Sequence, residues 1–247
     1  SFAFCFLIGK KVPVRITRLK KEMLSKNITC RILGLGLSPF LILATDSVII
    51  IIMNTVLQHY GGPKEGDLLI TCATIVQSYM MLITGPMLGI SSGTQAILSY
   101  NYGAKATRRV RKAERCILLL CLCFTSLMFL LSRIVPQYFI GIFTRDPGLT
   151  DLCIWGIHIF TLMIVPLSFQ YVFVDGFTAL GRSKTALFLS LFRKGDYVLF
   201  TMILPIFYGA RSAFYAQPLA DGIAAVMSTI AFLLIFKKHL QKQEVSL

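Results

Sequence analysis

Long apolar segments alternate with short polar ones along the chain. Most of the apolar segments reach or exceed the roughly 20 residues that a helix needs to cross the hydrocarbon core of a bilayer. The polar segments between them carry glycine, proline and charged residues, which break helices and form turns. The pattern predicts six membrane-spanning helices, over residues 32–58, 68–100, 114–132, 152–180, 184–208 and 212–236.

The overall composition agrees with this pattern. Only 15% of the residues are charged and the mean hydropathy is +0.73, whereas roughly 25% of the residues are charged in soluble domains. The predicted fold class is therefore all-α: a polytopic membrane protein with one bundle of six transmembrane helices.

Both ends of the chain lie outside the predicted bundle of residues 32–236. Residues 1–9 are apolar and run directly into basic residues, which is typical of the tail of a preceding transmembrane helix. Residues 10–31 alternate basic and apolar positions at roughly helical spacing, which favours an amphipathic linker on the cytoplasmic membrane surface; a solvated linker is the alternative. Residues 237–247 are expected to form a cytoplasmic tail. The chain is therefore interpreted as a fragment or as half of something larger.

The basic residues are distributed unevenly between the two sides of the predicted bundle. Nineteen Lys and Arg residues lie in the segments of one side and four in those of the other. Because cytoplasmic loops accumulate Lys and Arg, the basic loops and both ends of the chain are expected in the cytoplasm, with the protein in the inner (plasma) membrane. The net charge of +14 then indicates membrane lipids as partners and no nucleic acid, because no soluble domain is left to bind one.

Asp46 is an ionisable residue at the centre of an apolar segment. It lies some 14 residues into the first span, and ionisable groups at that depth are costly and usually functional. Pro39, seven residues earlier, lies on nearly the same helix face and removes a backbone hydrogen bond. Asp46 is therefore a candidate binding site for a cation or a proton; a protonated side chain used for packing is the alternative.

Other polar residues within the spans are candidates for a cavity wall. Ser168, Tyr171, Asp175 and Thr178 form one polar stripe at helical spacing, and such a stripe is expected to face a cavity. Asp221 is a secondary acidic candidate, while Arg193 and Asp196 are expected to pair on one face of the fifth span. The full set of cavity or substrate candidates is Asn54, Gln77, Gln95, Asn101, Ser168, Gln170, Tyr171, Asp175 and Thr178.

The second span contains small residues at a spacing of four. Gly85, Gly89 and Gly93 recur on one face, and such residues let two helix backbones approach closely. With a neighbouring proline they also offer a point where the helix bends. Packing and bending are both open, and the hinge candidates are Pro39, Gly85, Pro86 and Gly89.

No catalytic constellation is recognisable in the chain. The three histidines are isolated, and the sequence contains no phosphate-binding loop and no cluster with metal-ligand spacing. The sequence therefore predicts a protein that is not an enzyme, with no catalytic residue, no metal site and no cofactor besides a coupling ion.

Four sequence motifs, in this order and at these spacings, resemble one transporter family. They are "LGLSPFLILATDS" followed by "HYGG", "GISSGTQAILSYNYGAK" followed by "RVRKA", "TALGRSKTALFLSLFRK" and "YAQPLAD". Together they resemble the multidrug and toxic compound extrusion (MATE) family of cation-coupled efflux transporters, over essentially the whole chain.

The resemblance implies a place for this chain within a larger protein. Members of the family resemble two facing bundles of six helices, and this chain matches the second bundle, so the partner it lacks is an N-terminal six-helix bundle. Asp46 falls where many members carry an acidic residue implicated in cation coupling. The acidic residue of the tenth helix in some members corresponds to Gln170 here.

The function expected from the resemblance is secondary active transport. The chain would export drugs or organic cations in exchange for Na⁺ or H⁺ by alternating access between two bundles. Two alternatives are a flippase for lipid-linked saccharides of the same superfamily and a truncated half-carrier that is inactive without its N-terminal bundle.

Overall fold

The computed structural model describes residues 26–236 of the protein. The predicted helix tail 1–9, residues 10–25 of the linker and the predicted tail 237–247 lie outside the described residues. The chain divides into two compact units, Ser1–Leu41 and Ile42–Leu247. In the first unit the described residues are helical from Lys26 onward. All contacts reported below belong to the second unit.

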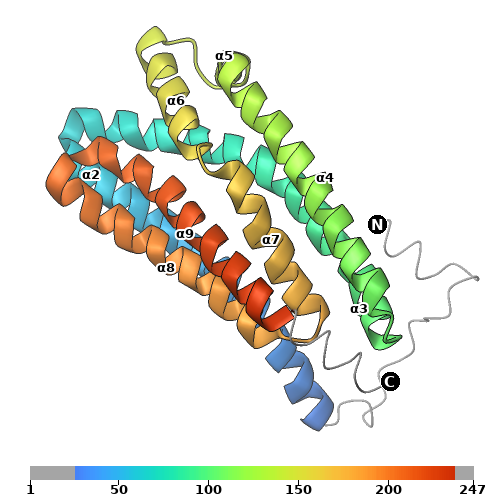
Figure 1. Ribbon diagram of the computed structural model, residues 1–247. Helices are drawn as coiled ribbons and strands as arrows, with labels where there is room; N and C mark the ends of the chain where they lie inside the picture. Colours follow the sequence, from blue (N-terminus) through green and yellow to red (C-terminus); the bar gives the residue numbers. More distant parts are fainter. Residues whose placement is uncertain (1–25, 237–247) are drawn as a thin grey trace, which may run out of the picture. The chain divides into compact units, whose positions relative to one another are not determined.

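The described residues form helices joined by short connections (Figure 1). The predicted all-α, polytopic fold class is confirmed. The elements are α2 (Lys26–Gly93), α3 (Gln95–Gly103), α4 (Thr107–Ile134), α5 (Pro136–Ile140), α6 (Pro147–Phe160), α7 (Ile164–Ala179), α8 (Ser183–Tyr208), the 3₁₀ segment η2 (Ala210–Tyr215), α9 (Ala216–Ala231) and the π-helical segment η3 (Phe232–Phe236).

Helix α2 turns back on itself at Gly62 (Figure 1). Gly62 has φ 68° and ψ −173°, a conformation that only glycine adopts without strain. At the same turn a Cβ on Gly61 would lie 2.8 Å from backbone atoms of Gly66, so the chain closes tightly there. The turn divides α2 into a first leg up to residue 61 and a second leg over residues 63–93, which correspond to the first two predicted spans.

The remaining predicted spans also coincide with helices. Ala44–Gly103, Thr107–Ile134 and Ala210–Ile235 are long and apolar enough to cross a membrane, and α6 and α7 reach that length together as a pair bent by 50°, which fits a broken span or a re-entrant loop. Helix α8 carries Arg193, Lys194 and Asp196 near its middle and falls outside that set because of these charges. The fifth predicted span is therefore a helix with a charged centre.

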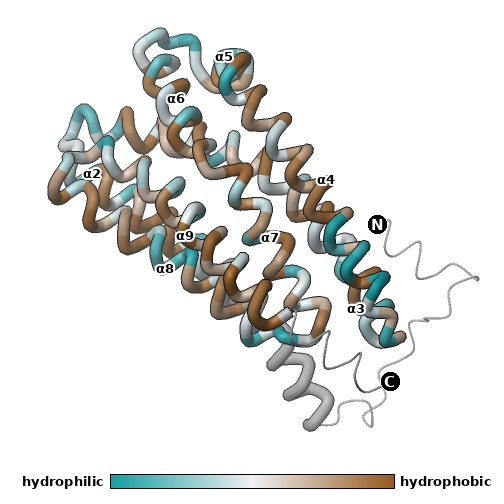
Figure 2. The backbone as a smooth tube through the Cα atoms, in the orientation of Figure 1, coloured by the Kyte–Doolittle hydropathy of each residue, from teal (hydrophilic) through white to brown (hydrophobic). Residues whose placement is uncertain are grey.

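Helix α7 is the element that joins the others. It packs against α9, α4, α8 and α3 (Figure 1). One apolar cluster joins the second leg of α2 with α6 and η2 around Phe160 and Phe214, whose rings lie 5.5 Å apart. A second apolar cluster joins α4 and α7 with the C-terminal end of the second leg of α2. Figure 2 shows the apolar residues along the middle of the helices and polar ones near the α3–α4 and α5–α6 connections.

The glycine stripe of the second leg packs against no other described residue. A Cβ added at Gly85, Gly89 or Gly93 would meet no atom within 4 Å. Within residues 26–236 the stripe makes no close helix contact, and its role in packing stays a prediction. The helix is regular through Pro86 and ends at Gly93, and α3 begins after Thr94. A hinge role for Pro39, Gly85, Pro86 or Gly89 stays a prediction, and the side chain of Pro39 is not among those described.

Candidate functional site

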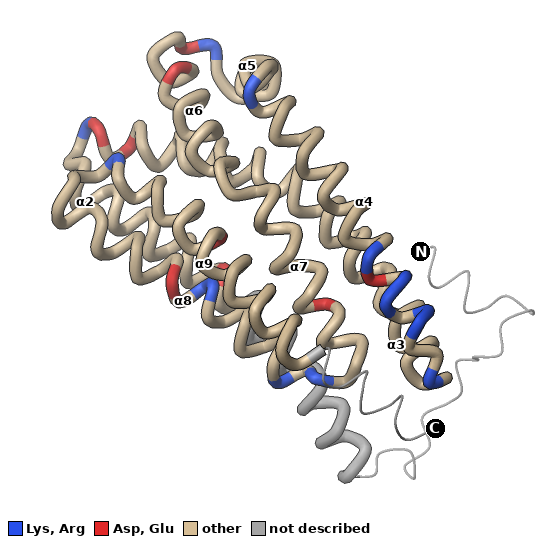
Figure 3. Tube along the Cα trace, viewed as in Figure 1, with Lys and Arg blue, Asp and Glu red and all other residues tan. Residues whose placement is uncertain are grey.

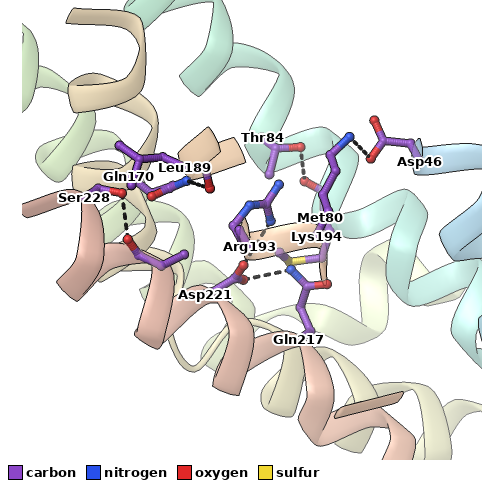
Figure 4. A network of polar contacts seen from close by, with 11 residues as sticks. Asp46, Met80, Thr84, Gln170, Leu189, Arg193, Lys194, Gln217, Asp221 and Ser228 are labelled. Atoms are coloured by element: carbon purple, nitrogen blue, oxygen red, sulfur yellow. Dashed lines mark hydrogen bonds and ion pairs between the residues drawn. The ribbon is translucent and has the colours of Figure 1, made fainter. Parts of the chain in front are cut away.

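Asp46 and Lys194 form an ion pair across two helices. The Lys194 Nζ of α8 lies 2.6 Å from Oδ1 of Asp46 on the first leg of α2. Figure 4 shows the two side chains pointing toward each other. The Asp46 side chain is 52% exposed, whereas that of Lys194 is 5% exposed. The carboxylate is therefore open to other partners on one side while the ammonium is enclosed by protein.

Arg193, the residue before Lys194, makes a second ion pair with another helix. Its NH1 donates to Oδ1 of Asp221 on α9 at 3.0 Å, and Gln217 Nε2 donates to Oδ2 of the same carboxylate at 2.8 Å (Figure 4). The guanidinium carbon also lies 5.7 Å from the centre of the Tyr171 ring on α7, within cation–π range. This pair ties α7, α8 and α9 together.

The expected pair between Arg193 and Asp196 is wrong. The guanidinium reaches Asp221 instead, and Oδ2 of Asp196 is buried without a hydrogen-bond partner. A pairing at i and i+3 on an exposed helix face is worth only tenths of a kcal/mol. A fully enclosed carboxylate on a neighbouring helix is a far stronger partner, because it has no water to compensate its charge.

The two aspartates of this network differ in burial. Asp221 has no exposed side-chain surface and accepts from two donors, whereas Asp46 is half exposed. Breaking the Asp221 pair leaves a charge in a dry interior, which is costly. Asp46 lies on the open side of its pair, where half of its side chain is exposed. The two carboxylates are therefore paired with adjacent residues of α8 in different surroundings, one enclosed and one accessible.

Gln170 of α7 lies beside α8, one helix turn from the ion pairs. It is 3% exposed, and its Nε2 donates to the carbonyl of Leu189 at 3.2 Å (Figure 4). Its Oε1 is buried without a hydrogen-bond partner. The side chain thus joins α7 to α8 and leaves one acceptor free.

The predicted polar stripe of α7 does not face one cavity. Ser168 hydrogen-bonds Thr125 of α4 at 2.8 Å, and Thr178 is exposed and donates to Val174 of its own helix. Asp175 accepts from Ser91 at 2.5 Å and from Gln95 at 2.8 Å. Because α7 is surrounded by neighbours, residues of this one stripe contact α2, α3, α4 and α8, so the stripe as a whole does not line one cavity.

The remaining cavity candidates do not all lie near the ion pairs. Asn54 and Gln77 are half-buried on the two legs of α2, and Asn101 donates to the carbonyl of Ile97 on its own helix. Gln95 belongs to the Asp175 contacts, away from Lys194. A role in substrate binding stays a prediction for all four.

Two buried charged residues were missed by the sequence analysis. Lys194 lies inside the fifth predicted span, where a lone cation implies a carboxylate partner that the sequence does not identify. Glu114 is the first residue of the third predicted span, 114–132, and no role was predicted for it, yet it is 3% exposed. The signal for Glu114 was its spacing: Val110, Glu114, Ile117 and Cys121 fall on one buried stripe of α4.

No group of three or more His, Cys, Asp or Glu side chains that could hold a metal ion occurs within residues 26–236.

Residues 40–204 match the model of the MatE family. The chain belongs to the MatE family. The matched range begins just before Asp46 and includes Lys194, so the family region contains the first ion pair. The resemblance drawn from the four motifs is thereby confirmed.

Curated relatives of the chain are named as multidrug exporters. It is 19% identical over 224 residues to the multidrug export protein MepA of Staphylococcus aureus (strain N315), covering 91% of this chain and 47% of that protein. It is 18% identical to MepA of S. aureus (strain bovine RF122 / ET3-1) over the same shares. The chain spans about half the length of the curated relatives it matches.

Solved structures share the fold of this half. The chain matches the outward-facing conformation of a multidrug resistance MATE family transporter of the MOP superfamily with a TM-score of 0.81 and 19% identity, covering 98% of this chain and 53% of that one. It matches the inward-facing conformation of such a transporter with a TM-score of 0.75 and 18% identity, covering 98% and 54%. At this identity the likeness shows the fold alone.

Proposed function

We propose that this chain forms one half of a secondary active transporter that exports drugs or organic cations in exchange for Na⁺ or H⁺. The observation that carries the proposal is the Asp46–Lys194 pair, a half-exposed carboxylate held 2.6 Å from an enclosed ammonium. Membership of the MatE family and the names of the curated relatives support export as the direction and drugs as the cargo.

Asp46 would couple the ion to the conformation by exchanging partners. In one state its carboxylate pairs with Lys194, and in the other it holds a proton or Na⁺ while Lys194 is released from it. Ion coupling requires that the ion bind the two states with different affinity. The enclosed ammonium supplies that difference, because it competes with the ion only in the state in which the two helices are close.

The missing cavity wall would come from an N-terminal six-helix bundle, the partner expected from the family resemblance. The chain spans about half of its relatives, and alternating access needs two bundles that move against each other. The coupling ion is the only cofactor in this proposal, and the membrane lipids and the organic cation are its other partners.

The charges of the network favour a cationic cargo over a lipid-linked saccharide. Two cations, Arg193 and Lys194, are matched by two carboxylates, Asp46 and Asp221. An anionic lipid headgroup requires an excess of positive charge in its cavity, and this network has none. The flippase alternative is therefore kept as an outcome of the test below.

Ion-driven efflux by the intact transporter tests the role of Asp46. We expect Asp46→Asn to abolish the dependence of cationic-dye efflux on the Na⁺ or H⁺ gradient, with a loss of roughly tenfold or more in ion-driven rate, in the range typical of coupled sites. Lys194→Gln is expected to lower the ion concentration that gives half-maximal drive, because the competitor of the ion is gone. Proteoliposomes with imposed gradients give both quantities.

Glu65→Gln is the matched control, because Glu65 forms an exposed ion pair with Arg211 away from the network. It is expected to leave efflux unchanged. Ion-driven efflux that persists in Asp46→Asn would overturn the coupling role. Transport of a lipid-linked saccharide in place of the dye would overturn the cargo class. The 247-residue chain alone is expected to show no ion-driven uptake.

A further inference from the structure

Glu114 is a buried carboxylate without a hydrogen-bond partner among residues 26–236. It is 3% exposed, and neither of its carboxylate oxygens has a hydrogen-bond partner. It lies two turns into α4 on the stripe that packs against α7, between Val110 and Ile117, which are both buried in an apolar cluster. Ionised carboxylates are rarely tolerated in such surroundings without compensation.

The carboxyl group of Glu114 rests directly on the backbone of α7. A Cβ on Gly176 would lie 2.7 Å from Oε1 of Glu114 and 3.3 Å from Cδ and Oε2. Only glycine therefore leaves room for the carboxyl group at this position. The close approach directs both oxygens at the end of α7, where Asp175 is the preceding residue.

Asp175 brings a second carboxylate to the same place. Its two oxygens accept from Ser91 Oγ at 2.5 Å and from Gln95 Nε2 at 2.8 Å. Both donors are neutral, so they leave the negative charge of Asp175 uncompensated. Asp175 and Glu114 are also near enough for their charges to repel each other.

Among residues 26–236, no basic side chain hydrogen-bonds either carboxylate oxygen of Glu114. Arg108, Arg111 and Arg115 of α4 are exposed, although they flank Glu114 in sequence. Figure 3 shows Lys and Arg gathered along the start of α4. Within residues 26–236, the other ionisable groups in the same apolar cluster are Cys121 on α4, Tyr102 of α3 and Tyr171 of α7, and none of them carries a positive charge.

We propose that Glu114 and Asp175, with Ser91 and Gln95, form a binding site for one positive charge, a proton or a monovalent metal cation. Two carboxylates in a dry cluster require such a charge, and the unpartnered oxygens of Glu114 are the atoms that receive it. The site is separate from the Asp46–Lys194 pair, and its existence does not depend on the transport activity proposed above.

The position of the site gives it a mechanical consequence. Ser91 precedes the break at Thr94 between α2 and α3, and Gln95 follows it, so both sides of the break bind the same carboxylate. Helices α3, α4 and α7 pack pairwise at this point (Figure 1). A bound charge therefore holds these helices together, and its loss lets Glu114 and Asp175 repel each other and the helices separate. Tyr171, four residues before Asp175, links α7 to the Arg193 pair.

The test uses the intact protein in lipid nanodiscs and two independent measurements. Infrared difference spectra between acidic and alkaline buffer report a protonated buried carboxyl group through its carbonyl band. Thermal unfolding in NaCl against choline chloride at equal ionic strength reports specific Na⁺ binding. The variants are Glu114→Gln and Asp175→Asn, which keep side-chain size, and Asp151→Asn at an exposed position of α6 is the matched control.

If the site holds a proton, Glu114→Gln loses one carboxyl band that Asp151→Asn keeps. In Asp175→Asn the same band then disappears at a lower pH, because the neighbouring negative charge is gone; a merely structural role would not move it.

If the site holds a metal cation, the stabilisation by NaCl over choline is lost in both site variants and kept in the control. Bands and Na⁺ responses that are the same in the wild type, Glu114→Gln and Asp175→Asn would overturn the proposal. Should Glu114→Gln fail to fold, Asp175→Asn decides between these outcomes alone.

Discussion

Asp46 and Asp221 show how two aspartates in membrane-spanning helices acquire different roles. Both pair with a basic residue of α8, and the two basic residues are adjacent in sequence. Asp221 is completely enclosed and bound by two donors, while half of the Asp46 side chain is exposed. The environment of each carboxylate, and not its residue type, determines whether it can exchange partners.

This difference predicts opposite patterns of stability and transport for the two aspartates. We expect Asp221→Asn to lower the free energy of unfolding by about 3–5 kcal/mol, because it leaves the Arg193 guanidinium without its counter-charge in a buried pair. Asp46→Asn is expected to cost less stability but to abolish ion coupling. Thermal unfolding in nanodiscs measures the first effect. A larger loss of stability in Asp46→Asn than in Asp221→Asn would contradict this division of roles.

At the residue scale the sequence revealed charges but not their partners. An aspartate within a long apolar run stands out by composition alone, so Asp46 was identifiable. Its partner was not, because Lys194 lies on a helix far along the chain and no local rule connects the two. The incorrect Arg193–Asp196 pair has the same cause: helical spacing shows which neighbours are within reach but not which competing partner a tertiary contact provides.

At the scale of elements, glycines that look alike in sequence have different surroundings. Gly156 of α6 is enclosed, and a Cβ there would lie 2.9 Å from Cγ2 of Val76 and 3.2 Å from Cε1 of Phe214. Gly89 and Gly195, also helical, would meet nothing within 4 Å. The regularly spaced glycines of the second leg attracted a packing interpretation, whereas the isolated Gly156 lies at a close approach between helices of the bundle.

Alanine substitution tests this contrast. We expect Gly156→Ala to destabilise the protein by about 1–3 kcal/mol, because the added methyl group overpacks the contact between α6, α2 and η2. Gly195→Ala is the control and is expected to stabilise α8 by about 0.5–1 kcal/mol, since alanine has the higher helix propensity. Unfolding temperatures of the two variants check the prediction, and equal shifts would show that the packing argument is incorrect.

At the scale of the whole molecule, the basic loops gather at one end of the bundle, while the loops at the other end carry both signs of charge. Figure 3 shows one end rich in Lys and Arg along α3, α4 and the α7–α8 connection, while the turn of α2 and the α5–α6 connection carry both signs. The described loops therefore keep the asymmetry counted along the sequence. The positive-inside rule predicts that the basic end lies in the cytoplasm.

Labelling of single cysteines tests this orientation. In a variant without native cysteines, we expect a membrane-impermeant maleimide to modify Lys64→Cys, in the turn of α2, on intact cells. Lys112→Cys on α4 is expected to react only after the membrane is permeabilised. Both side chains are exposed, so accessibility within the protein does not limit either reaction. The reverse pattern of labelling would show that the bundle is inserted the other way round.

The sequence by itself determined the fold class, the number of apolar segments, the family and the acidic residue at the centre of the first span. These properties follow from local composition and motif order, because a bilayer selects long apolar helices whatever their neighbours are. Only the tertiary structure decided which charges pair, that the stripe of α7 contacts four other helices, and that the side chain of Glu114 is buried against α7. Those outcomes depend on the helices that meet at each point, and no periodicity within one helix contains that information.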